Sequence, residues 1–207
     1  MQYFNYLALG DSYTIGEQVL LNKNFPYQFI RKMRKYTYHA GKQFSFAAPE
    51  IVAKTAWTTD ELAAGIDAWV FDPAGYDMVS LLIGVNDQYR GRSVTGFEEQ
   101  FSELLQKAID FARGNSDNVY VLSIPDWGIT PFAAGRDVEV IAREIDTFNS
   151  AAEYISKERR CNFLDITTGQ REFGNLKDYL APDGLHPSEK EYNRWADSLV
   201  GRVLSNL

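Results

Sequence analysis

The chain has 207 residues, of which 45% are hydrophobic and 24% are charged, which is enough apolar material for a packed α/β domain and excludes a disordered chain. Its 28 acidic and 21 basic residues leave a net charge of −7, which repels phosphate backbones and anionic lipid surfaces. We therefore expect no nucleic-acid partner. No apolar run approaches the roughly 18 residues of a membrane-spanning helix, so we expect no stable membrane insertion.

The single cysteine, Cys161, excludes a disulfide framework within the chain and a thiolate-rich zinc site. The N-terminal residues 1–6 lack the positive charge and the long apolar stretch of a secretion signal. Both features predict a cytoplasmic protein. A secreted protein whose signal had been removed would look the same.

Apolar segments of strand length alternate with longer segments of helical periodicity along the chain. Strands are predicted at residues 4–9, 50–54, 78–83, 119–124 and 162–164. No repeat and no linker rich in proline, glycine or serine interrupts the series, so residues 1–207 are predicted to form one domain.

Three apolar stripes predict helices that pack on the sheet. The stripes consist of Phe97, Phe101, Leu104, Ala108, Phe111 and Ala112; of Val138, Ile141, Ile145, Phe148, Ala152 and Ile155; and of Tyr192, Ala196, Leu199 and Val203. Three capping boxes mark helix starts, namely Thr58 with Glu61, Thr95 with Glu98 and Ser188 with Glu191. Strands that alternate with helices indicate a parallel sheet covered on both faces, with a ligand crevice beyond the carboxyl ends of the strands.

Three segments rich in small or polar residues lie at those predicted strand ends, at residues 10–12, 54–59 and 84–87. Ser12 follows the first strand, where a substrate carbonyl could approach its hydroxyl. An alcohol is a poor nucleophile until an adjacent base accepts its proton. The sequence therefore has to supply a base, and histidine is the most common one.

The chain contains only two histidines, His39 and His186. His39 lies in a polar segment, and we predict that it is solvated. His186 follows Asp183 by three residues, so the carboxylate can accept a hydrogen bond from the imidazole and leave its other nitrogen free as a base. The alternative is a turn in which Asp183 binds backbone amides and His186 faces water.

Taken together, Gly10-Asp11-Ser12, Gly84-Val85-Asn86-Asp87 and Asp183-Gly184-Leu185-His186 resemble the first, third and fifth sequence blocks of the SGNH or GDSL-type hydrolase superfamily. The resemblance implies a three-layer α/β/α fold with a flavodoxin-like, parallel five-stranded sheet. It also implies Ser12 as nucleophile, His186 as general base, Asp183 as its orienting carboxylate, and no cofactor or metal. The backbone N–H of Ser12 and the Asn86 amide would belong to the oxyanion hole.

The second block of that superfamily normally supplies a glycine N–H to the oxyanion hole, and this chain has Ala56 at the aligned position. Alanine can donate the same N–H if its φ is negative and its methyl group does not crowd the acyl group, and we expect Ala56 to do so. Asp87 is expected to brace its loop. The alternative for Asn86 and Asp87 is a pair of turn residues that end a strand.

The loop at residues 124–132 follows the fourth predicted strand and is punctuated by proline and glycine. Trp127 and Phe132 are predicted to form walls of the substrate pocket, and so are Trp57 and Tyr89 because they lie near the proposed donors. The alternative is that these aromatic side chains attach their loops to the core.

The resemblance implies hydrolysis of carboxylic esters, and the acidic chain without an apolar lid favours small acyl esters, including acetylated carbohydrates, as the small-molecule substrate. A lysophospholipase or thioesterase of the same fold is an alternative, because fold does not choose the substrate. Two further candidates are a carbohydrate-binding module without catalysis and a metal hydrolase that uses Asp11, Asp87, Asp183 and His186. The α/β-hydrolase elbow is disfavoured because the segment after Ser12 lacks the second glycine of G-x-S-x-G.

Overall fold

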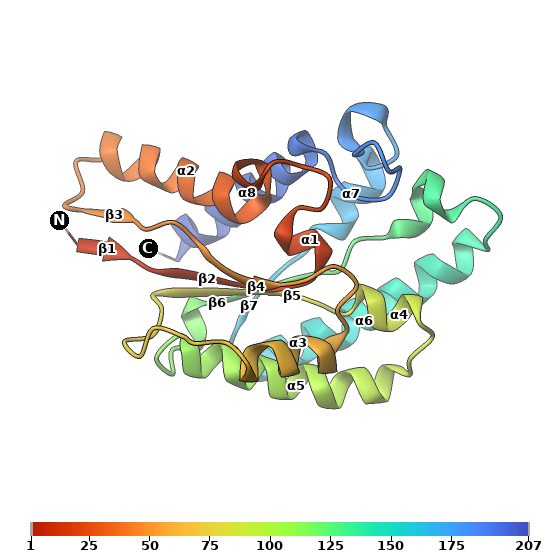
Figure 1. The fold of residues 1–207 in the computed structure, drawn as a ribbon, viewed down its shortest axis with the longest axis horizontal. Helices are drawn as coiled ribbons and strands as arrows, with labels where there is room; N and C mark the ends of the chain where they lie inside the picture. The colour runs from red at the N-terminus through yellow and green to blue at the C-terminus, as the bar shows by residue number, and fades with distance from the viewer. Residues whose placement is uncertain (1, 207) are drawn as a thin grey trace.

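The computed structural model describes residues 2–206 of the chain. A parallel five-stranded sheet runs through the middle of the molecule in the order β4-β2-β5-β6-β7 (Figure 1). The strands are β2 (Tyr6–Gly10), β4 (Glu50–Ala53), β5 (Met78–Leu82), β6 (Val119–Leu122) and β7 (Asn162–Leu164). Each predicted strand has a counterpart in this sheet, and the order, in which the first of these strands lies between the second and third, is the flavodoxin-like one.

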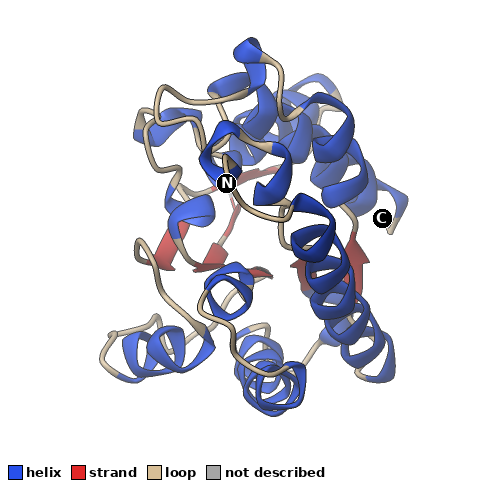
Figure 2. Ribbon diagram, turned by 90° about the vertical axis from the view of Figure 1, so that its right-hand side faces the viewer, coloured by secondary structure: helices blue, strands red, loops and turns tan. Residues whose placement is uncertain are grey.

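Helices cover both faces of the sheet and make the fold a three-layer α/β/α structure (Figures 1 and 2). One face carries α1 (Ser12–Ile15), α2 (Phe25–His39) and α8 (Glu189–Ser205), and the other carries α3 (Thr59–Asp67), α5 (Val94–Phe111) and α6 (Val138–Glu158). The shorter helices are α4 (Val85–Tyr89) and α7 (Thr167–Phe173). Single 3-10 turns are η1 (Leu21–Lys23), η2 (Ser116–Asn118), η3 (Trp127–Ile129), η4 (Pro131–Ala133) and η5 (Lys177–Tyr179).

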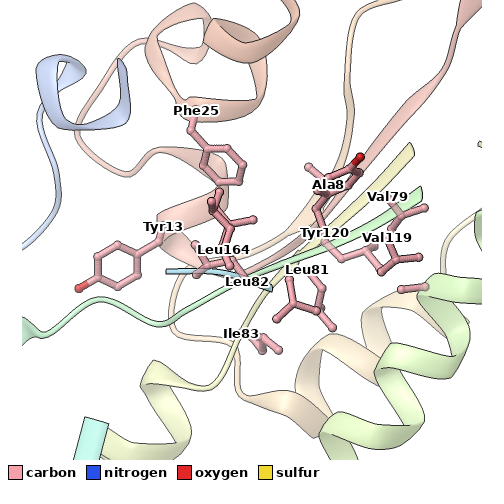
Figure 3. Close-up of a cluster of buried hydrophobic side chains, with 14 of the residues drawn as sticks. Ala8, Tyr13, Phe25, Val79, Leu81, Leu82, Ile83, Val119, Tyr120 and Leu164 are labelled. Carbon is pink, nitrogen blue, oxygen red and sulfur yellow. The ribbon is translucent and has the colours of Figure 1, made fainter. Parts of the chain in front are cut away.

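The apolar side chains of the sheet and of the predicted helical stripes meet in the core. All five residues of β5 are buried, as expected for a central strand that has helices on both faces. Figure 3 shows side chains of β2, β5, β6 and β7 gathered around the sheet. Of the predicted stripe residues, Val138 is an exception because it is half exposed at the first turn of α6. The core holds the carboxyl ends of β2 and β5 in fixed positions.

Of the three predicted capping boxes, the one formed by Thr58 and Glu61 is present, and the other two are not. The Glu61 carboxylate accepts the Thr58 N–H at 2.9 Å at the start of α3. The cap of α5 is Ser93 rather than Thr95, because the Ser93 hydroxyl already accepts the Gly96 N–H. Ser188 caps α8 as predicted, but Glu191 is buried and accepts the indole N–H of Trp195 instead of closing a box.

The predicted first strand is two strands in the structure. Residues Gln2–Phe4 form β1, which pairs in parallel with β3 (Phe44–Phe46), a strand that the sequence did not predict. Asn5 separates β1 from β2, and its N–H donates to the Asp77 carboxylate at 2.8 Å instead of joining a ladder. None of the helices between residues 2 and 206 has the length and apolar character needed to cross a membrane.

Candidate active site

Ser12 lies at the carboxyl end of β2, where the chain turns into α1. Gly10 ends the strand, and a side chain there would collide with the Leu82 carbonyl oxygen and the Thr14 side chain, so only glycine fits. Asp11 caps α1 by accepting the Tyr13 N–H at 3.0 Å. The cap leaves Ser12 as the first helical residue, whose N–H has no acceptor within the helix.

His186 lies beside Ser12 although the two residues are 174 positions apart in the sequence. Its Nε2 atom is 3.0 Å from the Ser12 Oγ atom, and the side chain is only 7% exposed. The residue sits just before α8, where a bridge between Leu180 and Pro187 closes the loop that carries it. The alternative in which His186 faces water is therefore wrong for this structure.

The Asp183 carboxylate holds the imidazole ring of His186. One oxygen is 2.6 Å from His186 Nδ1, and the other accepts the N–H groups of Leu185 and His186 at 3.0 Å each. Partial burial raises the pKa of Asp183, but these hydrogen bonds outweigh it and leave the pKa below its usual value. Asp183 is therefore ionised near neutral pH and can stabilise a positively charged imidazole.

Asn86 is carried by α4, which begins directly after β5 and Gly84. Its Nδ2 atom donates to the Trp57 carbonyl oxygen at 3.0 Å and lies 3.3 Å from the Asp11 carboxylate. Asn86 lines the same pocket as Ser12 and Ala56. The structure thus brings together the three groups that the resemblance implies for an oxyanion hole.

Ala56 adopts a left-handed conformation with φ of 66°, so the negative φ on which its expected donation was conditional is not found. The Trp57 N–H donates to the Lys54 carbonyl at 3.2 Å, which closes a turn with Ala56 at its third position. Tight turns that need a positive φ at this position favour glycine. A residue with a Cβ atom pays about 1–2 kcal/mol for the left-handed conformation.

Two buried carboxylates lie beneath the site. Asp87 accepts the Thr59 N–H at 3.1 Å and the Thr59 hydroxyl at 2.8 Å, which ties α4 to the start of α3 and fits its expected bracing role. Burial raises the pKa of Asp87 despite these hydrogen bonds. Asp11 is fully buried, and its burial raises its pKa to about 8.

A pocket of about 180 Å³ opens beside Ser12 and His186. The predicted residues Tyr89, Trp127 and Phe132 line it, with ring centroids 5.3 to 6.0 Å apart. Trp127 is also buried in the fold, and its indole N–H donates to Gln88 at 2.7 Å. The Trp127 ring therefore serves both as a pocket wall and as an attachment of its loop.

Trp57 does not line the pocket, contrary to the prediction. Its ring lies over Gly65 of α3, where a Cβ atom would come within 2.1 Å of the indole, so the glycine makes the space for the ring. Only the Trp57 backbone belongs to the site, through the carbonyl that accepts from Asn86. Sequence proximity to the proposed donors was a poor guide here because the turn at Ala56 points the next side chain away.

The sequence reasoning missed Tyr13, Thr55, Val85 and Leu185, which also line the pocket. Each is adjacent in sequence to a motif residue, and that proximity was the only available signal. It also missed Arg136, whose guanidinium lies 5.3 Å from the Tyr89 ring centroid and 5.6 Å from that of Trp127. No pattern in the sequence marks this arginine.

The carboxylates and histidine considered as ligands of a catalytic metal are not arranged for that purpose. Within residues 2–206, no group of three or more histidine, cysteine, aspartate or glutamate side chains is placed to hold a metal ion. His39 is exposed at the end of α2, as expected.

The sheet order and the pocket beyond the carboxyl ends of its strands define the chain as a flavodoxin-like α/β protein with its ligand site at the expected edge of the sheet. The model of the GDSL-like lipase/acylhydrolase family matches residues 8–194, and the chain belongs to this family. The protein is therefore a carboxylic ester hydrolase. The recognition of the superfamily and of its fold from three short blocks is confirmed.

Solved structures with this fold include an acetylxylan esterase from Geobacillus stearothermophilus, with 17% identity, a TM-score of 0.71 and coverage of 97% of this chain and 94% of that one. A lipase/acylhydrolase from Enterococcus faecalis has 20% identity and a TM-score of 0.69, and the match covers 100% and 97% of the two chains. A psychrotrophic esterase from Pseudoalteromonas sp., inhibited by monoethylphosphonate, has 15% identity, a TM-score of 0.69 and 97% coverage of both chains. No curated protein shows significant sequence similarity to the chain.

Proposed function

We propose that the protein hydrolyses small carboxylic esters through a covalent acyl-enzyme formed on Ser12. The observation that carries this proposal is the continuous contact from Ser12 Oγ to His186 Nε2, at 3.0 Å, and from His186 Nδ1 to Asp183, at 2.6 Å, at the edge of an apolar pocket. An imidazole at hydrogen-bond distance from a hydroxyl can accept its proton as the oxygen attacks.

In the first half of the reaction, the Ser12 oxygen forms a bond to the ester carbonyl carbon while His186 takes the hydroxyl proton. The C–O bond to the alcohol then breaks, and the imidazolium returns that proton to the leaving oxygen. Asp183 is held ionised and stabilises the imidazolium in between. In the second half, water attacks the acyl-enzyme, His186 accepts its proton, and Ser12 regains a proton as the carboxylic acid leaves.

The negative charge on the former carbonyl oxygen needs donors that are already aimed at it. We assign this role to the backbone N–H groups of Ser12 and Ala56 and to the Asn86 amide. The Ser12 N–H is at a helix start, and none of the backbone hydrogen bonds of the described residues uses the Ala56 N–H. Both N–H groups are therefore free to donate to a substrate oxygen.

The size and lining of the pocket favour a short acyl group. An apolar cavity of about 150 Å³ is known to hold one benzene molecule. The pocket here, at about 180 Å³, has walls of Val85, Tyr89, Trp127, Phe132 and Leu185 and suits an acetyl to butyryl group better than a fatty acid. The far part of a long acyl chain would lie outside the pocket in solvent. Because that part is not buried, it would add no hydrophobic free energy to binding.

Acetylated carbohydrates are the substrates that we favour within this class. Phe132 and Tyr89 are 44% and 41% exposed at the pocket, so both side chains can contact the apolar face of a sugar, although Arg136 lies over the Tyr89 ring. The acetylxylan esterase from Geobacillus stearothermophilus has a similar fold, so the fold is compatible with such a substrate without selecting it.

The test is a series of p-nitrophenyl esters from acetate to palmitate together with a panel of acetylated sugars. We expect kcat/KM to be highest for acetate to butyrate and to fall for longer chains, with acetate released from acetylated xylose oligomers. A preference for palmitate, or for acyl-CoA thioesters or lysophospholipids over all simple esters, would contradict the proposed substrate class and favour the lysophospholipase or thioesterase alternative.

A matched pair of variants tests the contribution of the exposed ring to sugar binding. Phe132→Ala is expected to raise KM for acetylated sugars more than for p-nitrophenyl acetate, because only the sugar would stack on the ring. Tyr154→Ala removes another exposed aromatic ring, 66% exposed on α6 and outside the pocket lining, and should change neither value. Equal effects of the two substitutions would contradict the role of Phe132.

A protein that only binds carbohydrates would show sugar affinity without ester cleavage, and it would have no need of the Ser12, His186 and Asp183 contacts. Exhaustive chelation separates the serine mechanism from a metal hydrolase, because ester cleavage should persist undiminished after treatment with a chelator.

A further inference from the structure

Ala56 is held in its unfavourable conformation by contacts on both sides. The left-handed region is costly for a residue with a Cβ atom, so a free loop would leave it for a conformation with negative φ. On the N-terminal side, the Thr55 hydroxyl donates to the Glu17 carboxylate. On the C-terminal side, the Ala56 carbonyl oxygen accepts a hydrogen bond from Arg90 at 2.7 Å.

Arg90 and Asn86 lie one helical turn apart at α4 and bind consecutive carbonyl groups. The Arg90 N–H donates to the Asn86 carbonyl at 3.0 Å, which places both side chains on the same side of the helix. Arg90 binds the Ala56 carbonyl, and Asn86 binds the Trp57 carbonyl at 3.0 Å. Two successive peptide groups of the turn are thus fixed to one rigid element.

Glu61 completes this arrangement by orienting the arginine. Its carboxylate lies 3.3 Å from the Arg90 guanidinium and also accepts the Thr58 N–H at 2.9 Å at the start of α3. The guanidinium therefore joins the end of α4, the turn at Ala56 and the first turn of α3. Arginine suits this position because its planar group carries several donors in fixed directions.

We propose that Arg90 is a positioning residue for the reaction: it holds Ala56 in the left-handed conformation and so keeps the Ala56 N–H directed at the developing oxyanion. The assignment deepens the proposed function and rests on it. A glycine at position 56 would need this support less, because glycine enters the left-handed region at no steric cost.

The experiment is a double-mutant cycle of Arg90→Ala and Ala56→Gly, with p-nitrophenyl acetate as substrate. Arg90→Ala is expected to lower kcat by about tenfold to a hundredfold and to change KM less than threefold, since the lost interaction acts on the transition state. In the Ala56→Gly background the same substitution should cost less than a third as much in kcat. Arg90→Lys, which keeps a donor and the charge, should recover part of the activity.

Arg113→Ala is the matched control. Arg113 also binds two backbone carbonyls, those of Ala74 and Gly75, and pairs with Asp77, but it does so at the opposite end of β5. Its removal should leave kcat within twofold of the wild type. An unchanged kcat for Arg90→Ala, or an equal loss in the alanine and glycine backgrounds, would overturn the proposal.

Urea unfolding of the four proteins of the cycle measures, without any catalysis, how strongly Arg90 holds the turn at Ala56. We call this interaction the clamp. If Arg90 holds Ala56 against its preference, Ala56→Gly should raise the unfolding midpoint less in the Arg90→Ala background than in the wild type, because without Arg90 the alanine can relax out of the left-handed region. Additive midpoints would overturn the clamp. Coupled midpoints in a protein that cleaves no ester would instead leave the clamp standing and contradict the proposed function.

Discussion

The Asn86 amide group has two hydrogens. Two protein acceptors, the Trp57 carbonyl and the Asp11 carboxylate, and the substrate oxygen of the proposed mechanism compete for them. The Trp57 carbonyl takes one at 3.0 Å, while the contact to the Asp11 carboxylate is longer, at 3.3 Å. A hydrogen bond this long is weak, so under the proposed mechanism the hydrogen that faces Asp11 is the one that Asn86 could give up to a substrate oxyanion. The contact with Trp57 orients the Asn86 side chain in the free protein, as the proposed oxyanion role requires of a donor.

Asn86→Ala should lower kcat for p-nitrophenyl acetate by about a hundredfold or more, equivalent to roughly 3 kcal/mol, while KM changes little. Circular dichroism should show a folded protein. Asn193→Ala on α8 serves as the control, because it removes an asparagine amide that donates to Asp197 on the same helix. A loss of less than fivefold in the Asn86 variant would show that the amide does not serve the oxyanion.

Asp11 makes the stability of the fold depend on pH. Burial raises its pKa from 3.8 to about 8, so the folded state holds the proton more tightly than the unfolded state does. Between these two values, unfolding releases a proton, and the free energy of unfolding falls as pH rises. The contribution is complete below about pH 4 and is lost as the pH passes 8.

Asp11→Asn removes this titration. Relative to the variant, the wild type should lose up to about 1.4 kcal/mol of stability for each pH unit within that window, as measured by urea unfolding at several pH values. A constant difference between the two proteins from pH 4 to 8 would contradict the shifted pKa of Asp11.

At the scale of the elements, the junction between β5 and α4 depends on Gly84. Its φ of 123° is one that other residues avoid, and a Cβ atom would lie 2.6 Å from the Phe97 ring. Gly91, after the end of α4, also has a positive φ, of 69°, but a Cβ atom there would meet nothing within 4 Å. A side chain at Gly91 would cost only the free energy of the backbone conformation. A side chain at Gly84 would cost that and the collision with Phe97 as well.

Gly91→Ala should therefore lower the free energy of unfolding by about 1 kcal/mol, the cost of a left-handed residue. Gly84→Ala should lower it by about 2–4 kcal/mol, because overpacking against Phe97 adds to the strain. It should also lower kcat, since α4 carries Asn86. Equal destabilisation by the two substitutions, measured by urea unfolding, would contradict the close approach of Phe97 to Gly84.

The major elements could be predicted because each follows from a local pattern. The buried strand β5 and the stripes of α5 and α6 are long and strongly periodic, so their positions did not depend on tertiary contacts. The pair of β1 and β3 was missed because these two short strands are defined by their pairing with each other, outside the five-stranded sheet. The cap at Ser93 was missed because Thr95 with Glu98 offers a competing pattern two residues later.

At the scale of the whole molecule, the candidate site could be predicted as far as the rules of parallel sheets extend. Strand ends gather at one edge, so the segments that carry Ser12 and Asn86 were expected to lie together, and their shared pocket confirms it. The conformation of Ala56 and the orientation of Trp57 could not be predicted. Both belong to a turn whose carbonyl groups are bound by Asn86 and Arg90, about 30 positions further along the chain.

The role of Arg90 could not be predicted from local sequence patterns either. Its contact to Ala56 joins residues 34 positions apart and leaves no local signal in the sequence. Only the packed molecule places the end of α4 against the turn after β4.

The most direct test of the central claim, that Ser12 is an activated nucleophile, is active-site titration with a fluorescent organophosphonate followed by mass spectrometry. We predict one label for each wild-type molecule, located on the peptide that contains Ser12, and none on Ser12→Ala under the same conditions. Absence of labelling in the wild type, or equal labelling of Ser12→Ala, would contradict the mechanism.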